Sequence, residues 1–445
     1  MHTPELLLPA GTLDKMRTAY AFGADAVYAG QPRYSLRARN NEFRLEQLAT
    51  GIQEAHQLGK KFYVASNLMP HNAKVKTYLA DMAPVVAMQP DALIMADPGL
   101  IMLVREQFPE MPVHLSVQAN TVNYAAVKFW KSLGLTRVIL SRELSLDEIE
   151  EIRQQCPDIE LEVFIHGALC IAYSGRCLLS GYFNHRDSNQ GTCTNACRWD
   201  YQVSAADEDA AGDLQKLDFD FDRALEDANL SACGSQPRHP AADKVYLIAR
   251  RDHPDELMPI MEDEHGTYIM NSKDLRAVEH VERLVQIGVD SLKVEGRTKS
   301  IYYVARTAQV YRKAIDDTVA GKPFDPALLG ALDALANRGY TDGFYQRHRT
   351  HEQQNYLRGH SESFRQQYVG DIVACNDGVA EIDVKNRFEV GDRVEIIHPS
   401  GNCIITIHEM YNSDNAAVTE APGSGHRVRI PLAGNLAQGM VARFL

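Results

Sequence analysis

Eight short β-rich runs recur through the first 300 residues, and amphipathic helical stretches separate most of them. Stretches such as "RLEQLATGIQEAHQLG" and "SLDEIEEIRQQC" carry apolar residues at helical spacing. Strands that alternate with helices form parallel βαβ units, and eight such units close into a TIM-type (β/α)8 barrel. The predicted fold class is therefore α/β, with an open doubly wound sheet as the alternative. The runs lie at 5–10, 24–30, 61–67, 91–97, 113–120, 137–143, 161–167 and 291–297.

The alternation stops twice along the chain, and these breaks predict the domain organisation. We expect a TIM-like barrel over 1–300, with an insertion at about 168–265 between the seventh and eighth runs. A helical extension over 301–365 should pack on the barrel. Over 366–445, short strands with turn residues between them predict a small all-β barrel domain.

Composition places the chain among soluble globular proteins. The N-terminal "MHTPELLLPAGT" has no basic leader, and the most apolar segment, "PVVAMQPDALIMADPGLIMLV", is broken by Asp91, Asp97 and three prolines. We therefore expect a cytoplasmic protein with no membrane partner. The net charge of -13 argues against a generally basic nucleic-acid binder, although it permits a local basic patch.

Half of the eight cysteines lie in a 28-residue stretch that follows the seventh β-rich run. In a reducing compartment such a cluster is more often metal-binding or catalytic than disulfide-bonded. Four thiolates could hold zinc or an iron–sulfur cluster, and spacing alone does not decide between them. The alternative of buried apolar cysteines is disfavoured by the polar surroundings in "SGRC" and "GTCTNAC". The predicted metal ligands are Cys170, Cys177, Cys193 and Cys197.

The other cysteines are interpreted differently. Cys233 lies in a loop-like stretch and could replace Cys197 as the fourth ligand. Cys156, Cys375 and Cys403 are expected to fill hydrophobic cores.

Strand alternation predicts which side chains point into the barrel. In "HLSVQAN" the polar residues share one face, which places Gln118 and Asn120 inside. In "SLKVEGR", Lys293, Glu295 and Arg297 likewise share a face. Buried charges are costly unless they are paired or used, so these three form either a structural network or a substrate site. We favour the site, because the carboxyl ends of the strands carry the chemistry in TIM barrels.

These residues define a predicted catalytic face. His166 ends the seventh run and joins Gln118, Asn120 and Glu295 as a candidate catalytic residue. Lys293 and Arg297 are candidate ligands of a small dicarboxylate, whose oxygens match their donors.

The loop after the second run, "QPRYSLRARNNEF", is a candidate RNA contact near the same face. Arginines beside a tyrosine can meet phosphates and stack on an unpaired base. An ordinary solvated loop is the alternative. The candidate substrate-binding residues here are Arg33, Tyr34, Arg37 and Arg39.

The segment "EVFIHGALCIAYSGRCLLS" (162–180) resembles the signature of the U32 family, historically called peptidases. "LLLPAG", "ADAVYAG", "SVQAN", "GTCTNACRW", "NSKDL" and "KVEGR" are similar to its other blocks, and the last 80 residues resemble its C-terminal β-domain. The resemblance covers essentially the whole length and is weakest at 204–260. No H-E-x-x-H helix or G-x-S-x-G elbow supports the peptidase label.

Within the family, "YAGQPRYSLRARNNEF" and "MPHNAKVKT" resemble members that hydroxylate carbon 5 of the wobble uridine of certain tRNAs. That resemblance implies an oxygen-independent, prephenate-dependent enzyme with a four-cysteine [4Fe–4S] cluster, linked to the iron–sulfur assembly machinery and acting on the tRNA anticodon loop to form 5-hydroxyuridine. Some relatives take the fourth cysteine from a later segment. The alternatives are a hydroxylase of ribosomal RNA or a quinone precursor, a collagenase-like peptidase, and an RNA-binding protein with a structural cluster.

Overall fold

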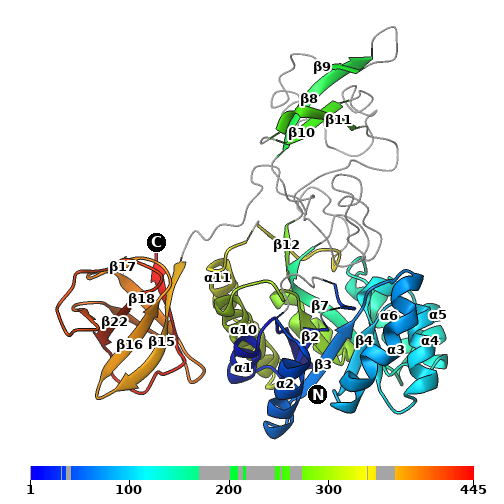
Figure 1. Ribbon diagram of the computed structural model, residues 1–445, viewed down its shortest axis with the longest axis horizontal. Coiled ribbons are helices and arrows are strands. Elements are labelled where there is room, and N and C mark those ends of the chain that lie inside the picture. Colours follow the sequence, from blue (N-terminus) through cyan, green and yellow to red (C-terminus); the bar gives the residue numbers. More distant parts are fainter. Residues whose placement is uncertain are drawn as a thin grey trace.

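Eight parallel strands close into a barrel in the computed structural model (Figure 1). The last of them, β13, pairs in parallel with both β7 and β1, so the sheet has no free edge within this ring. Each of the eight β-rich runs contributes one strand, which confirms the predicted TIM-type barrel and excludes the open sheet. The strands are β1 (Glu5–Pro9), β2 (Ala26–Gly30), β3 (Lys61–Ser66), β4 (Ala92–Met95), β5 (Val113–Leu115), β6 (Arg137–Ile139), β7 (Glu160–Ala168) and β13 (Ser291–Val294).

The structure describes residues 2–31, 33–36, 42–169, 273–337, 339–346 and 366–445. Between 201 and 260 it also describes the backbone of four strands, which form an antiparallel sheet in the order β11-β10-β8-β9. These strands are β8 (Tyr201–Glu208), β9 (Leu214–Lys216), β10 (Tyr246–Arg250) and β11 (His253–Ile260).

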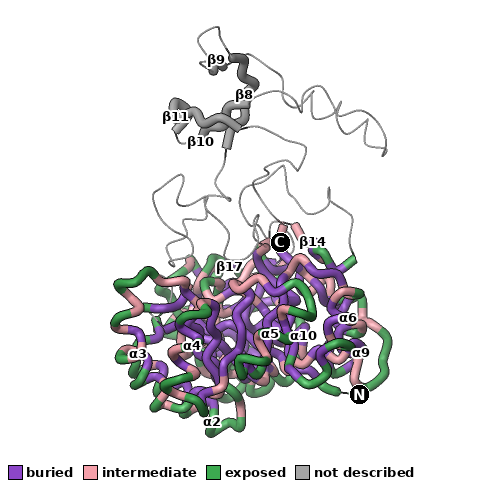
Figure 2. The backbone as a smooth tube through the Cα atoms, turned by 90° about the vertical axis from the view of Figure 1, so that its right-hand side faces the viewer, coloured by how far each residue is buried: buried purple, intermediate pink, exposed green. Residues whose placement is uncertain are grey.

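Helices surround the strands, which form the buried centre of the barrel (Figure 2). Side-chain caps start several of them: Thr12, Asp97 and Asn123 each accept a hydrogen bond from a first-turn amide. The helix after β13, α10, packs against α1, α9 and β1 as the eighth helix of the ring. The helices are α1 (Leu13–Ala21), α2 (Leu45–Gln57), α3 (Asn72–Ala87), α4 (Pro98–Gln107), α5 (Tyr124–Ser132), α6 (Leu146–Gln155), α9 (Val281–Ile287), α10 (Ile301–Val319) and α11 (Ala327–Asp333).

Two short strands extend the sheet at the carboxyl end of β7. Strand β12 (Asp274–Arg276) runs antiparallel to β7, with Asp274 opposite Ala168, and β14 (Tyr340–Thr341) pairs with β12. The chain therefore leaves β7 and returns in β12 at the same place. Both ends of the insertion lie at the carboxyl ends of the barrel strands.

The C-terminal domain is an antiparallel half-barrel, as the all-β prediction required. Its seven-stranded sheet has the order β19-β18-β23-β15-β16-β22-β20, and β17 pairs separately with β21. Its core contains Val369, Ile382, Val394 and Ile430. The strands are β15 (Gln366–Asn376), β16 (Val379–Val384), β17 (Phe388–Glu389), β18 (Arg393–Ile397), β19 (Cys403–Thr406), β20 (Tyr411–Asn412), β21 (Glu420–Ala421), β22 (Arg427–Pro431) and β23 (Met440–Phe444).

Polar and aromatic contacts join α10 to this domain. The buried Arg306 donates to both carboxylate oxygens of Glu395, at 3.1 and 2.5 Å, and to Gln366 at 3.1 Å. The Tyr302 and Tyr368 rings stack, with centroids 5.2 Å apart. Because the guanidinium is buried, its pairing fixes the half-barrel against the barrel.

Inside the barrel, charged side chains form a network toward the amino-terminal ends of the strands. Arg137, 2% exposed, donates to Glu5 at 2.6 Å and to Glu162 at 3.0 Å. Glu162 also accepts from the Lys293 ammonium at 2.8 Å. Burial lowers the pKa of Lys293, and the Glu162 carboxylate opposes that shift. The network links β1, β6, β7 and β13.

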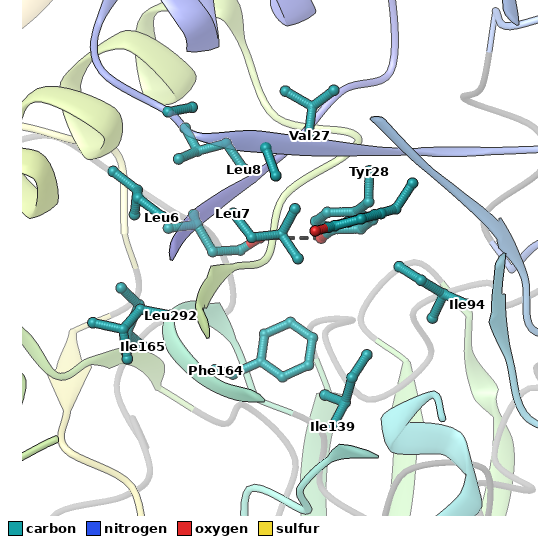
Figure 3. Close-up of a cluster of buried hydrophobic side chains, with 14 of the residues drawn as sticks. Leu6, Leu7, Leu8, Val27, Tyr28, Ile94, Ile139, Phe164, Ile165 and Leu292 are labelled. Carbon is teal, nitrogen blue, oxygen red and sulfur yellow. Dashed lines mark hydrogen bonds between the residues drawn. The ribbon is translucent and has the colours of Figure 1, made fainter. Parts of the chain in front are cut away.

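An apolar layer adjoins this network in the barrel interior. Leu7, Tyr28, Ile94, Ile139 and Phe164 come from five strands and point toward one another (Figure 3). Large interlocking side chains of this kind fill a TIM barrel and leave no channel along its axis.

Replacing Glu162 by Gln tests the network. The change leaves Lys293 without its carboxylate in a buried site, and we expect the free energy of unfolding to fall by about 3–5 kcal/mol. Urea unfolding followed by circular dichroism measures the loss. Glu150→Gln, which removes the surface partner of Arg283, should cost less than about 1 kcal/mol. If both variants lowered the free energy of unfolding equally, the buried network would contribute no more to stability than a surface ion pair.

Candidate functional site

Polar side chains gather where the carboxyl ends of β3, β5, β6 and β13 meet. Hydrogen bonds connect several of them across strands: the Ser141 hydroxyl donates to the side-chain Oδ1 of Asn120 at 3.0 Å, and the Asn67 side chain donates to the Ser116 hydroxyl at 3.4 Å. We call this cluster the barrel mouth; it comprises Asn67, Ser116, Gln118, Asn120, Ser141, Arg142, Glu143, Glu295 and Arg297.

Strand alternation predicted that Gln118 and Asn120 point inward, but this premise is wrong because neither residue is part of a strand. Strand β5 ends at Leu115, and a 3₁₀ turn over Val117–Ala119 follows. The Ser116 hydroxyl caps this turn by accepting from the Gln118 amide, and Asn120 adopts a left-handed conformation with φ of 55°. A serine that bonds its own neighbouring backbone offers the chain an alternative to the strand ladder. Both residues nevertheless lie at the mouth.

The three charges of "SLKVEGR" separate in the structure. Lys293 lies inside the barrel, with its ammonium 2.8 Å from Glu162 and 4.4 Å from the centroid of the Tyr28 ring. Glu295 and Arg297 follow the end of β13 and belong to the mouth, where Arg297 donates to the Leu36 carbonyl at 2.6 Å. Lys293 does belong to a charged network, but its partner in that network, Glu162, comes from β7 and not from β13.

Arg142 is a mouth residue that the sequence analysis missed. Its guanidinium donates to Glu295 at 2.5 Å and to the Ala168 carbonyl at 3.0 Å, and it lies 4.0 Å above the Phe164 ring. It therefore connects β6, β13 and the last residue of β7, two positions before Cys170. The available signal was an arginine near the end of the sixth β-rich run, at the predicted catalytic face.

His166 is buried beside α10 and β14. Its ring is 1% exposed and has the Tyr303, Tyr311 and Tyr340 rings around it, with centroids 5.7, 5.6 and 5.4 Å away. Burial, with the charge of Lys299 nearby, lowers the pKa of His166 from 6.5 to about 3. The imidazole is therefore neutral at physiological pH.

The candidate RNA loop, residues 31–43, is described at 31, 33–36 and 42–43. The Tyr34 ring is fully buried, edge-on to Tyr78, and its hydroxyl donates to Asp81 at 2.5 Å. Arg33 is half-exposed and pairs with the same Asp81 at 2.6 Å. Tyr34 thus anchors the loop and does not present its ring to solvent. The predicted contacts Arg37 and Arg39 lie outside the described residues.

The predicted metal ligands also lie outside the described residues, as does Cys233. Among the residues that are described, no group of three or more His, Cys, Asp or Glu side chains could hold a metal ion. Cys156 is buried in the barrel core, and Cys375 and Cys403 pack against the core of the half-barrel, as expected. In the same part of the chain, no helix has the length and apolarity needed to cross a membrane.

Fold and mouth together define an α/β-barrel protein with a cysteine-bearing insertion at the carboxyl ends of its strands and an appended half-barrel. The chain belongs to peptidase family U32: residues 11–355 match that family, and residues 365–443 match its C-terminal domain.

Curated relatives span nearly the whole chain. The tRNA hydroxylation protein P of Escherichia coli is 61% identical over 97% of this chain and 94% of its own length. The protein of the same name in Haemophilus influenzae is 59% identical over 99% and 96%. A collagenase of Porphyromonas gingivalis is 27% identical over 96% and 94%.

The depressed pKa of His166 predicts a pH-dependent contribution to stability. Between pH 6.5 and about 3 the unfolded chain binds a proton that the folded chain does not, so this contribution is present above pH 6.5 and is lost as the pH falls. The free energy of unfolding of the wild type should fall by up to about 1.4 kcal/mol per pH unit more steeply than that of His166→Gln. Urea unfolding at several pH values gives both slopes. Parallel slopes would show that the folded protein protonates His166 normally.

Proposed function

We propose that this chain is an iron–sulfur tRNA hydroxylase that forms 5-hydroxyuridine at the wobble position, with prephenate as co-substrate and without molecular oxygen. The observation that carries the proposal is 61% identity, over 97% of the chain, to a protein named for tRNA hydroxylation. In this proposal the enzyme is cytoplasmic and receives its cluster from the iron–sulfur assembly machinery.

The donor set of the insertion fits a [4Fe–4S] cluster. Cubane clusters are held by four cysteine thiolates, and Cys170, Cys177, Cys193 and Cys197 supply that number. The insertion that carries them begins and ends at the barrel mouth, which supports a cluster near the catalytic face. Bound there, the cluster would supply electron transfer. The choice between Cys197 and Cys233 as the fourth ligand stays open.

The mouth supplies groups that suit a small dicarboxylate. Lys293 lies deeper in the barrel on Glu162, and the described cations at the mouth itself include Arg142 and Arg297. Arginine matches carboxylate oxygens with two parallel donors, so these two residues would hold and orient the co-substrate. Glu295 positions the Arg142 guanidinium.

Amide and hydroxyl side chains at the mouth would orient the target base. Asn120 and Ser141 form one hydrogen-bonded pair, and Asn67 and Ser116 form another. Groups of this kind can read the polar edge of a uracil. An anticodon-loop base is unpaired or easily splayed out, so bringing it to the mouth costs at most a few kcal/mol.

Among the described residues of the barrel mouth, the peptidase alternative finds no serine or cysteine paired with a histidine; the Ser400–His398 pair, 2.7 Å apart, is exposed on the half-barrel. Ser141 contacts Asn120 and Glu143 at the mouth, and no histidine lies among its hydrogen-bond partners there. His166 is enclosed by tyrosines and is not paired with a described serine or cysteine. Serine and cysteine peptidases need such a pair to activate the nucleophile.

The cluster is tested by iron content. Protein purified without oxygen should carry about four irons and four sulfides per chain, as a cubane cluster requires. Replacing Cys170, Cys177, Cys193 or Cys197 by Ala should abolish the brown colour, whereas Cys156→Ala, Cys375→Ala and Cys403→Ala should retain it. Stoichiometric zinc without iron would exclude the cluster. Bleaching by Cys233→Ala but not by Cys197→Ala would reassign the fourth ligand.

The reaction is tested by mass spectrometry of tRNA nucleosides from a deletion strain grown without oxygen. We expect 5-hydroxyuridine and its derivatives to disappear, because anaerobic growth silences any oxygen-dependent route to the same product. The wild-type gene should restore them, and a cysteine variant should not. Blocking the conversion of chorismate to prephenate should reproduce the loss. An unchanged nucleoside profile would refute the tRNA assignment and make ribosomal RNA the next substrate to test.

A further inference from the structure

A cavity of about 560 Å³ lies at the junction of the barrel and the half-barrel. Its walls are the first turn of α10, the end of α11 and strands β15 and β23 of the half-barrel. We call it the junction pocket. Its volume is sufficient for a ligand of nucleotide size.

The lining of the junction pocket is cationic, amide-rich and aromatic. Lys299 contributes a positive charge from the barrel side, and Arg443 contributes one from β23. Arg443 donates to Gln367 at 3.0 Å and lies 3.5 Å from Asp392, so it is oriented while remaining at the wall. None of the described residues that line the pocket is an aspartate or a glutamate, although the chain as a whole has a net charge of -13. This local charge favours an anionic ligand.

Two of the three tyrosines that line the pocket are stacked on each other. Tyr302 of α10 and Tyr368 of β15 stack with an interplanar angle of 15°, and Tyr368 is the more exposed of the two. The Tyr368 hydroxyl donates to Asp371 at 2.6 Å, which holds the ring in place. A fixed ring beside cations is the arrangement that single-stranded nucleic acids use for stacking and phosphate contact.

Tyr303 links the junction pocket to the barrel mouth. It lines the pocket, donates to the Glu295 carbonyl at 2.7 Å and lies against His166. The pocket lining is therefore in direct contact with residues at the carboxyl ends of β7 and β13.

The pocket is also preformed. The buried contacts of Arg306 with Glu395 and Gln366 set the position of the half-barrel on α10, and they need no ligand to form. A rigid site loses less conformational entropy when it binds.

We propose that the junction pocket binds a single-stranded nucleotide of the RNA substrate that neighbours the target base. Lys299 and Arg443 contact its flanking phosphates, and the Tyr302–Tyr368 pair stacks on its base. The inference rests on the proposed function, because it takes RNA as the substrate. It gives the half-barrel a specific role, which is to provide one wall of the RNA site.

The test is binding of total tRNA, extracted from the deletion strain, to the full-length protein at several salt concentrations. For Lys299→Ala/Arg443→Gln we expect weaker binding and a logarithmic salt slope flatter by about 1.5 units, since each lost phosphate contact removes roughly 0.7–0.9. The matched control is Lys322→Ala/Arg427→Gln, which removes two exposed cations outside the pocket lining. Its salt slope should stay within about half a unit of the wild type.

A second pair of variants tests stacking. Tyr368→Ala should weaken tRNA binding by about five- to a hundredfold, whereas Tyr368→Phe retains a ring and should bind within about twofold of the wild type. Thermal melting shows that each variant is folded. If the double variant does not fold, Lys299→Ala alone should still flatten the salt slope by about 0.8 units.

The outcomes separate this inference from the proposed function. If the wild type binds tRNA and the pocket variants bind it with the same affinity and salt slope, the junction pocket is not an RNA site. The proposal that tRNA is the substrate would then still stand. Equal weakening by the pocket and control variants would also overturn it, because the charge would then act nonspecifically. A wild-type protein that binds no tRNA would count against both proposals.

Discussion

The buried network of Glu5, Arg137, Glu162 and Lys293 is the constraint on which the rest of the barrel depends. Its members come from the first, sixth, seventh and last strands of the ring. Buried charges are tolerated only when each finds its partner in good geometry, so the network penalises strand registers that separate them. Alternative barrel registers would leave at least one charge unpaired. The correct register in turn sets which residues reach the carboxyl ends of the strands.

From that register follows the arrangement of the functional groups. Arg142 and Glu295 meet at the mouth because the segments that follow β6 and β13 lie on either side of the end of β7. The insertion leaves and re-enters beside them through β7 and β12. Helix α10 then leads from the mouth to the half-barrel, where Arg306 fixes the contact. In the proposed function, the cluster, the small acid and the RNA would all meet at this end of the barrel.

Sequence patterns predicted the barrel because each strand is a short buried run. The composition of such a run indicates a β-strand whichever strands lie beside it in the sheet. They failed where a local hydrogen bond, or a partner distant in the sequence, determines the backbone conformation or the pairing of a side chain. The Ser116 hydroxyl ends β5 early, which strand alternation does not anticipate. The partner of Lys293 is Glu162, more than a hundred residues away, whereas the sequence pattern grouped Lys293 only with Glu295 and Arg297. Likewise, Tyr34 looks like an exposed loop aromatic until the fold places Asp81 and Tyr78 around it.

Closure of the ring has a consequence for how the chain is made. Ser291 on the last strand meets Glu5 on the first across 286 residues, which takes a ribosome roughly 15 to 60 seconds to synthesise. During that interval the half-made sheet exposes two unpaired edges, which are templates for pairing with other chains. Glu5 on β1 and Glu162 on β7 place inward-facing charges on those edges. The residues that later lock the barrel therefore also protect the nascent sheet from aggregation until β13 arrives.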